Sequence, residues 1–297
     1  YEHSSVARDH LREILENLGA EVISLGRTDQ FVPIDTEAVA ESDIRQARLW
    51  ATEYGFDAIL STDGDADRPL LGDAQGNYLR GDVVGILCAR YLGAEAVATP
   101  VSSNTALEKC GAFKRVERTR IGSPFVIEGM ERMISDGARS VVGFEANGGF
   151  LVGSRIEKAG RSLAPLPTRD AVLPILALLA MAREQNMPVA QLSASLPARF
   201  TASDRIQNFA TEKSRALLSG LAASEKVLSD FLAPLHATPA GIDQTDGLRI
   251  TLDNGEIVHL RPSGNAPELR CYAEAASQTR AASLADACLQ RVQAYEP

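Results

Sequence analysis

Three aspartates, Asp63, Asp65 and Asp67, occupy alternate positions in the segment STDGDADRP, directly behind an apolar run. Alternate side chains of an extended backbone point the same way, so the three carboxylates can converge on one point. Carboxylate oxygens are the ligands that Mg²⁺ prefers, and the ion keeps positions open for phosphate or water. Arg68 follows at once, and a guanidinium can grip phosphate oxygens through two hydrogen bonds. The segment predicts a magnesium site at a strand end, with Arg68 beside the phosphoryl group that the metal polarises.

Three other interpretations of the acidic segment stay open. A solvated acidic turn accounts for an isolated pattern of this kind about as well. An EF-hand fits poorly, because Arg68 stands where the loop needs Gly and Ala74 stands where it needs Glu. A phosphatase with a strand-end Asp nucleophile begins in the same way, but the later Lys and acidic motifs that it requires are not identified here.

A second candidate segment, GFEANGGF, starts at Gly143 and again follows an apolar strand pattern. Glu145 and Asn147 alternate, so both can reach into one cleft. A carboxylate and an amide suit paired sugar hydroxyls, which both donate and accept hydrogen bonds. For this segment taken alone, a structural turn is the favoured interpretation.

A third candidate segment, HLRPSGNAPELR, starts at His259. Arg261, Ser263, Gly264 and Asn265 offer a guanidinium, a hydroxyl, a backbone N–H and an amide, a set of donors that binds a phosphate dianion. The same composition also makes a plain hairpin turn, so the two interpretations are about equal.

The elements expected around these segments alternate between strand and helix over the first two thirds of the chain. Apolar spacing predicts a helix through residues 11–18, with Ser4 or Ser5 placed to cap it and Gly19 to end it, and a second helix over 36–54. Strands are expected over 21–25, 57–61, 96–101 and 140–144. Such a rhythm predicts parallel sheets covered by helices. Beyond Pro197, strand patterns from Gly247, Glu256 and Leu269 precede a last helix, which is typical of a small α+β domain.

The expected fold is therefore α/β, with two mixed α/β domains followed by a small α+β C-terminal domain. The first, residues 1–77, ends in the metal loop. The second, residues 78–198, carries the sugar-recognition loop, and the third, residues 199–297, carries the phosphate-binding loop.

Composition excludes several classes of function. A net charge of -9 without a basic stripe argues against a nucleic-acid partner. The longest apolar run, residues 171–182, is shorter than the roughly 18 residues that a membrane span needs, so a buried helix is expected and no membrane partner. Four scattered cysteines without CxxC spacing indicate reduced thiols and a cytoplasmic location.

Taken in order, DGDADR, the Gly-x-Glu-x-Asn segment and RPSGNAP resemble the α-D-phosphohexomutase family, which includes phosphomannomutases and phosphoglucomutases. The resemblance covers the whole chain and implies the second, third and fourth of the family's four domains. It implies metal, phosphoryl, sugar and phosphate contacts in that order, from Asp63, Asp65 and Asp67; Arg68; Glu145 and Asn147; and Arg261, Ser263, Gly264 and Asn265.

The reaction that the resemblance implies moves a phosphate between O1 and O6 of a hexose phosphate substrate. The cofactors implied are Mg²⁺ and a hexose 1,6-bisphosphate, which is both intermediate and activator. Mannose phosphates rank ahead of glucose phosphates. The glucosamine branch ranks lower, because Ala146 and Asn147 stand where that branch usually has Gln and Ser.

Four departures from the family pattern affect these expectations. Asn147 and Gly149 replace a usual Ser and His, and Ala266 replaces an acidic residue. Ser123 stands where His or Asp often follows the Gly of a segment that also contains Arg120, so the general base stays open. Arg120 and Ser123 are kept as candidate substrate contacts.

The fourth departure concerns the phosphoryl donor. The family's Thr-x-Ser-His-Asn-Pro loop, which carries the phosphorylated serine, has no counterpart in the sequence. The expectation is a chain that lacks the N-terminal phosphoserine domain and the strand before Tyr1, and that is inactive alone. The missing domain, or a polypeptide carrying it, is then the expected partner. A non-catalytic sugar-phosphate-binding module and a Mg²⁺-dependent sugar phosphatase are the alternatives.

Overall fold

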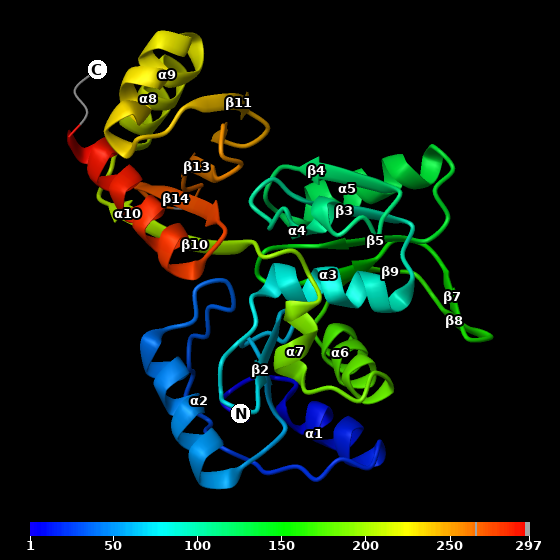
Figure 1. Cartoon of the computed structure of the whole chain (residues 1–297). Coiled ribbons are helices and arrows are strands. Elements are labelled where there is room, and N and C mark those ends of the chain that lie inside the picture. The colour runs from blue at the N-terminus through cyan, green and yellow to red at the C-terminus, as the bar shows by residue number, and fades with distance from the viewer. Residues whose placement is uncertain (265, 295–297) are drawn as a thin grey trace. The chain divides into compact units, whose positions relative to one another are not determined.

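The computed structural model describes residues 1–264 and 266–294 (Figure 1). These residues fall into two compact units, which divide between Pro197 and Ala198. Within the described residues, none of the helices combines the length and apolar character needed to cross a membrane. The mixed α/β first unit and the sheet-plus-helix second unit confirm the expected fold class. The finer division of the first unit at residue 77 stays a prediction.

The first part of unit 1 places the acidic segment on a hairpin. It contains the helices α1 (Arg8–Asn17) and α2 (Glu41–Tyr54) and the strands β1 (Ala58–Thr62) and β2 (Pro69–Asp73). The two strands pair antiparallel, with Ala58 opposite Asp73 and Thr62 opposite Pro69. Residues 63–68 therefore form the loop of a hairpin, and both ends of the acidic segment are held by the ladder.

The expected parallel sheet in this part of the chain was wrong, as was the strand over residues 21–25. A strand needs a ladder partner, and a cavity of about 580 Å³ lies between residues 19–25 and β1. At the end of this segment, the Leu25 carbonyl accepts a hydrogen bond from the backbone N–H of Glu2, 2.8 Å away. The apolar alternation at 21–25 thus faces the cavity instead of a neighbouring strand.

The helix expected over 36–54 begins later, at Glu41. The Asp35 carboxylate accepts hydrogen bonds from the backbone N–H groups of Glu37 and Ala38, at 3.0 and 3.2 Å. This local turn gives the backbone an alternative to helical hydrogen bonds, which is a common role of Asp. Residues 35–38 are consequently a turn that leads into α2.

The second part of unit 1 is a five-stranded sheet in the order β4-β3-β5-β6-β9. Strands β3, β4 and β5 are parallel, β6 pairs antiparallel with β5, and β9 pairs antiparallel with β6. The elements are α3 (Gly81–Leu92), β3 (Ala96–Pro100), α4 (Ala106–Lys109), β4 (Arg115–Thr119), α5 (Ser123–Ser135), β5 (Val141–Phe144), β6 (Phe150–Val152), the hairpin β7 (Ile156–Lys158) and β8 (Arg161–Leu163), β9 (Leu166–Asp170), α6 (Val172–Glu184) and α7 (Val189–Ala194). Strands expected over 96–101 and 140–144 are confirmed.

Helices cover both faces of this sheet, which explains why its inner strands β3 and β5 are buried throughout. Val97 and Phe144 join the core that α3 and α6 build on one face. Ala98 and Val141 pack with α5 on the other. Figure 1 shows α3 and α5 on opposite sides of β3 and β5. The period of two in each strand therefore divides its side chains between two cores.

The expected buried helix over 171–182 is confirmed as α6. Pro174 lies in its first turn, where the absent N–H has no intrahelical partner to lose. The Asp170 carboxylate accepts from the N–H groups of Val172 and Leu173, at 2.8 and 3.1 Å, and so satisfies the start of the helix.

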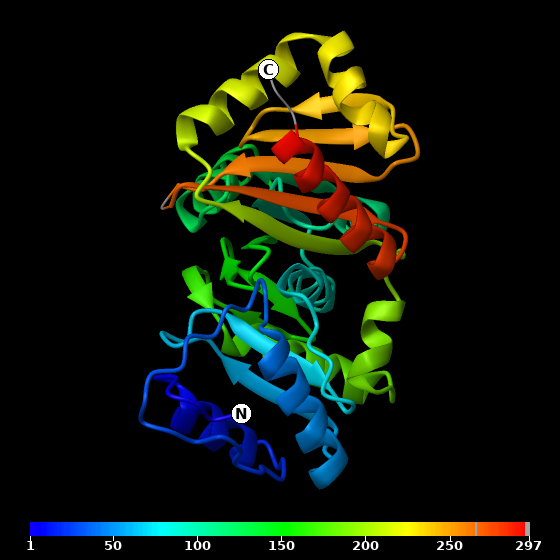
Figure 2. The same cartoon turned by 90° about the vertical axis from the view of Figure 1, so that its left-hand side faces the viewer.

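Unit 2 is an antiparallel sheet in the order β10-β14-β13-β12-β11, with helices on one face (Figure 2). Its elements are β10 (Phe200–Gln207), α8 (Thr211–Ala223), α9 (Glu225–Leu232), a 3₁₀ turn at Ala233–Leu235, β11 (Pro239–Asp243), β12 (Leu248–Leu252), β13 (Ile257–Pro262), β14 (Glu268–Ala275) and α10 (Gln278–Ala294). Alternate residues such as Ile250, Val258 and Cys271 are buried with the helices. The three strands expected after Pro197 are confirmed, and β10 and β11 are additional.

Candidate functional site

The acidic loop between β1 and β2 is a compact turn closed by its own first aspartate. One oxygen of Asp63 accepts hydrogen bonds from the backbone N–H groups of Asp67 and Arg68, both at 3.1 Å. Ala66 sits in the left-handed region with φ of 62°. The turn brings one carboxylate oxygen of each of Asp63, Asp65 and Asp67 within 4.8 Å of the others.

The strand end that carries the loop is fixed from the N-terminal segment. The Thr62 hydroxyl and the Ser5 hydroxyl share a hydrogen bond of 2.6 Å, and Thr62 also donates to the Asp63 carbonyl at 3.0 Å. His3 binds the Thr62 carbonyl at 2.7 Å through Nε2. These buried contacts hold the backbone at Asp63 and so the direction of its side chain.

Arg68 lies over the acidic loop without forming a strong ion pair. Its Nε atom is 3.5 Å from an oxygen of Asp63 and from Oδ1 of Asp67. These distances are too long for good hydrogen bonds. The side chain is one-third exposed, so its remaining donors can reach a ligand above the loop.

The second candidate segment forms a tight turn after β5. The Glu145 N–H donates to the Gly149 carbonyl at 3.0 Å, and the Gly148 N–H donates to the Glu145 carbonyl at 2.9 Å. Gly148 has a φ of 94°, a conformation that side chains disfavour. The side chain of Asn147 accepts from the Gly149 N–H at 3.0 Å through Oδ1, which leaves its amide N–H₂ to donate.

Two contacts from distant elements hold this turn in place. The Thr36 hydroxyl donates to the Asn147 carbonyl at 2.7 Å. The Cα of Gly81, at the start of α3, lies so close to the turn that a Cβ there would stand 2.2 Å from the Gly148 nitrogen. The turn is therefore wedged between residues 35–38 and α3.

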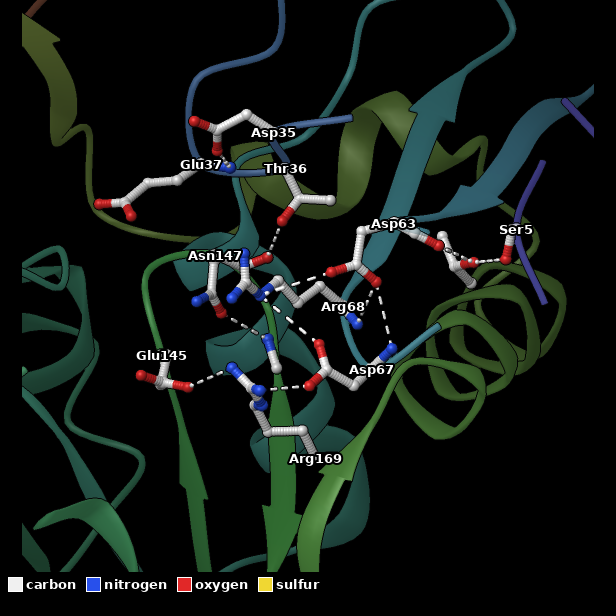
Figure 3. A network of polar contacts seen from close by, with 12 residues as sticks. Ser5, Asp35, Thr36, Glu37, Asp63, Asp67, Arg68, Glu145, Asn147 and Arg169 are labelled. Atoms are coloured by element: carbon white, nitrogen blue, oxygen red, sulfur yellow. Dashed lines mark hydrogen bonds and ion pairs between the residues drawn. The ribbon is translucent and has the colours of Figure 1, made fainter. Parts of the chain in front are cut away.

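Arg169 on β9 joins the acidic loop to the Glu145 turn (Figure 3). Its Nη2 pairs with Oδ2 of Asp67, and its Nη1 lies 3.5 Å from Oε2 of Glu145. Figure 3 shows the guanidinium between the two carboxylates, with Arg68 on the other side of Asp67. The network holds four carboxylates, from the three loop aspartates and Glu145, against the two guanidinium groups of Arg68 and Arg169.

Burial makes two carboxylates of this network, Asp63 and Glu145, hard to ionise. Burial, together with the negative charges of Asp67 and Asp65, raises the pKa of Asp63 to about 6, against the opposing hydrogen bond from the Arg68 N–H. Burial also raises the pKa of Glu145, against the opposing effect of Arg169 and Arg68. A cation among the carboxylates would relieve both costs.

The residues present fit a divalent cation. Oδ1 of Asp67 and Oε2 of Glu145 are buried and accept no hydrogen bond from the described residues. The three loop carboxylates supply hard oxygen ligands, as Mg²⁺ requires. Among the described residues, Asp63, Asp65 and Asp67 form the group of potential ligand side chains whose oxygens lie close enough together to hold one metal ion.

Arg120 and Ser123 belong to another part of the sheet edge. Arg120 is exposed after β4, and its guanidinium stacks on the Phe125 ring with 4.8 Å between Cζ and the ring centroid. Ser123 begins α5, directly after Gly122. Their role as substrate contacts stays a prediction.

The third candidate segment lies in unit 2, at the turn between β13 and β14. Nε of Arg261 donates to Asp246 at 2.9 Å, and the Ser263 N–H donates to the Glu268 carbonyl at 2.8 Å. Gly264 is exposed, and a Cβ on it would meet nothing within 4 Å. Asn265 lies outside the described residues.

Sequence reasoning missed Arg169 and Thr36. Thr36 contacts Asn147 and Arg169 contacts Asp67, each about a hundred positions away, and a local sequence pattern cannot predict such contacts. One signal was present for Arg169, since Gly149 stands where a larger residue was expected. A Cβ at Gly149 would lie 2.7 Å from Cδ of Arg169, so the glycine makes room for the arginine.

Comparison with known proteins agrees with this architecture. Residues 80–200 match the model described as phosphoglucomutase/phosphomannomutase, alpha/beta/alpha domain III, and residues 207–290 match the C-terminal domain of that family. The chain is 49% identical over 296 residues to a phosphomannomutase of Salmonella muenchen, covering 98% of this chain and 60% of the relative. It is 48% identical over 275 residues to a phosphomannomutase of Sinorhizobium fredii, covering 93% and 58%.

A solved structure gives the same fold. The crystal structure of a putative phosphomannomutase from Thermus thermophilus superposes with a TM-score of 0.69 at 19% identity, covering 98% of this chain and 60% of that one. The shared fold is a mixed α/β unit, which in this chain carries the acidic loop and the Glu145 turn, followed by a sheet-plus-helix unit; this defines the class of protein. Within that class, the chain belongs to the phosphoglucomutase/phosphomannomutase family. It spans about 60% of the length of the curated relatives it matches.

Proposed function

We propose that this chain binds the metal, the sugar and the phosphate in a phosphohexomutase that moves phosphate between O1 and O6 of a hexose. The observation that carries the proposal is the network in which Arg169 joins the acidic loop to the Glu145 turn. A metal site adjacent to a carboxylate and amide turn is what a phosphorylated sugar needs. The name phosphomannomutase, given to the relatives at 49% and 48% identity, supports mannose phosphates ahead of glucose phosphates.

In this proposal, Asp63, Asp65 and Asp67 hold Mg²⁺, which when bound offsets negative charge on the reacting phosphoryl oxygens. Arg68 is the residue closest to chemistry. Its guanidinium is held near the loop but keeps donors for two phosphate oxygens, so it binds and orients the transferring group. Orientation of this kind is the main contribution that a protein makes to phosphoryl transfer.

Sugar hydroxyls are recognised by the Glu145 turn. Glu145 accepts hydrogen bonds, and the Asn147 amide N–H₂ donates them, because its oxygen is already used by the Gly149 N–H. A donor and an acceptor side by side match a hydroxyl pair in either orientation of the sugar. This tolerance suits a reaction in which O1 and O6 exchange places.

Arg261, Ser263, Gly264 and Asn265 bind the phosphate that does not react. Hexose 1,6-bisphosphate is the intermediate of the proposed reaction and its activator. The proposal assigns the phosphoserine donor to no residue of this chain, so a polypeptide that carries it is the implied partner. A cytoplasmic location fits soluble phosphosugar substrates and stays a prediction.

The test combines binding with product analysis. Calorimetric titration with mannose 1-phosphate and glucose 1-phosphate, with and without Mg²⁺, is expected to show tighter binding of the mannose phosphate. Arg261→Gln is expected to weaken both. Arg155→Gln, on an exposed arginine that bonds Ser162, is the charge-matched control and is expected to bind as the unchanged chain does.

Phosphorus NMR of the same samples, with mannose 1,6-bisphosphate added, then separates the reactions. The chain alone is expected to leave mannose 1-phosphate unchanged, because the proposal assigns the phosphoserine donor to another polypeptide. Conversion of mannose 1-phosphate into mannose 6-phosphate without release of inorganic phosphate would instead place the donor on this chain. Steady release of inorganic phosphate from mannose 1-phosphate would replace the mutase with a phosphatase. Failure to bind any hexose phosphate would refute the assignment of all three loops.

A further inference from the structure

Arg169 is shared between two loops that the proposed function uses for different purposes. Its guanidinium pairs with Asp67 of the metal-binding loop through Nη2 and with Glu145 of the sugar-reading turn through Nη1, 3.5 Å away (Figure 3). Its side chain is 24% exposed and that of Glu145 only 6%. The bridge is therefore largely shielded from water. In such an environment an ion pair is stronger than at the exposed surface.

The surroundings of Arg169 keep it in this position. Its Cγ and Cδ atoms occupy the space next to Gly149, where a Cβ would approach them to 3.0 and 2.7 Å. The backbone continues from β9 into α6, whose first N–H groups are capped by the neighbouring Asp170. The guanidinium is thus carried by a strand and a helix start and not by a long loop, so it can position what it touches.

Arg169 and a bound cation would compete for the same carboxylate, that of Asp67. Asp67 offers one oxygen to Arg169, and its other oxygen is 3.5 Å from Arg68. A divalent cation on the loop must share Asp67 with two guanidinium groups. Removing one of these positive charges removes a repulsion to the cation, whereas removing a merely structural contact would loosen the loop and weaken binding.

We propose that Arg169 is a positioning residue that couples the metal loop to the sugar-reading turn, holding Asp67 and Glu145 at a fixed separation and opposing the divalent cation at Asp67. This inference rests on the proposed function only for the meaning of the two loops. Its contacts predict measurable effects with the metal ion alone, before any sugar phosphate is added.

The first arm of the test is titration of the chain with Mg²⁺ alone, or with Mn²⁺ followed by electron paramagnetic resonance. Arg169→Gln is expected to bind the cation about tenfold more tightly, because one charge a few ångströms away is lost. Arg169→Lys keeps the charge and is expected to stay within about twofold of the unchanged chain. Arg155→Gln removes the same net charge elsewhere in the unit and is expected to change affinity by less than about twofold.

Unchanged or weakened cation binding in Arg169→Gln refutes the opposition of Arg169 to the cation. An equal gain in Arg155→Gln refutes its local origin. No cation binding by the unchanged chain overturns both this inference and the metal site. Cation binding with the expected pattern, but without hexose phosphate binding, upholds the inference and overturns the proposed function.

The second arm is a double-mutant cycle of Arg169→Gln and Glu145→Gln, measured by urea unfolding. The two substitutions are expected not to add, since either one alone breaks the same ion pair. Arg169→Lys with Glu145→Gln should be more nearly additive, because a single ammonium group does not span both carboxylates. Strict additivity of the Gln pair refutes the coupling of the two loops.

Discussion

Replacing Gly81 by Ala should damage the candidate site from outside, without changing any of its polar side chains. Gly81 is the first residue of α3, and its Cα lies against the Glu145 turn. An added Cβ would stand 2.2 Å from the Gly148 nitrogen and 2.3 Å from the Asn147 carbonyl carbon. Both neighbours are backbone atoms, so no side chain can rotate out of the way.

The size of the effect follows from this geometry. Ordinary contact of a Cβ begins at 3.4 Å, so helix and turn must separate by roughly 1 Å. Overpacking of this kind costs about 1–3 kcal/mol, and the absence of a flexible neighbour favours about 3. A displacement of about 1 Å at a positioned site costs on the order of a hundredfold, so hexose phosphate affinity should fall by about that factor in addition to the loss of stability.

The assay is urea unfolding followed by the fluorescence of Trp50, the single tryptophan, which lies in unit 1. Hexose phosphate titration of the same samples provides the second measurement. Gly93→Ala is the matched control, because it ends the same helix with φ of 71° and an added Cβ there would meet nothing within 4 Å. It should lose about 1 kcal/mol from its left-handed backbone and keep full ligand affinity.

The reasoning would be refuted if Gly81→Ala bound hexose phosphate as the unchanged chain does, or lost no more stability than Gly93→Ala. Equal loss of ligand binding in both variants would also count against it. In that case global destabilisation, and not displacement of the turn, would explain the effect.

Three further predictions test other parts of the molecule. Mg²⁺ at a hundred times its Kd should stabilise unit 1 by about 2.7 kcal/mol in the Trp50 assay, EDTA should reverse this, and Asp67→Asn should abolish most of it. Burial lowers the pKa of His259 to about 4, below its value near 6.5 in the unfolded chain. The neutral imidazole is therefore fully compatible with the fold above pH 6.5, and the free energy of unfolding falls by about 3 kcal/mol as the pH drops from 6.5 towards 4. Urea unfolding at pH 7 and pH 4.5 should show this loss by circular dichroism, and His259→Gln should reduce the difference. Phe144→Ala should cost about 3–5 kcal/mol by urea unfolding, since this side chain is fully buried and packs against the Phe150 ring; a cost below 1 kcal/mol would contradict the assigned core.

Local sequence patterns correctly predicted two kinds of element: buried strands and helices that are apolar throughout, and strands of an antiparallel sheet that lie close together in sequence. The strands near residues 96 and 140 and the helix α6 carry apolar runs that both faces of a covered sheet or helix require. The three strands after Pro197 alternate in the manner of an antiparallel sheet with one covered face. In each case the side chains alone specify the environment.

Other elements depend on tertiary partners that no local pattern contains. Residues 21–25 have the composition of a strand, but face a cavity where a ladder partner would be needed. The acidic loop was expected at the end of a parallel strand and lies instead on an antiparallel hairpin. Arg169 reaches Asp67 from about a hundred residues away, and only the small residue at Gly149 hinted that a large side chain fills that space.

The antiparallel pairing of β1 and β2 has a consequence for the order in which the site assembles. The three aspartates lie within a hairpin of sixteen residues, from Ala58 to Asp73, so their approach requires only local contacts. Hairpins form in about 1–10 μs, whereas pairings distant in sequence wait for slow loop closure. Glu145 and Arg169 belong to the five-stranded sheet, so that sheet must form and pack against the hairpin before they can contact Asp67. A nascent chain would thus acquire its cation-binding carboxylates early, and its sugar-reading turn only when the sheet has closed.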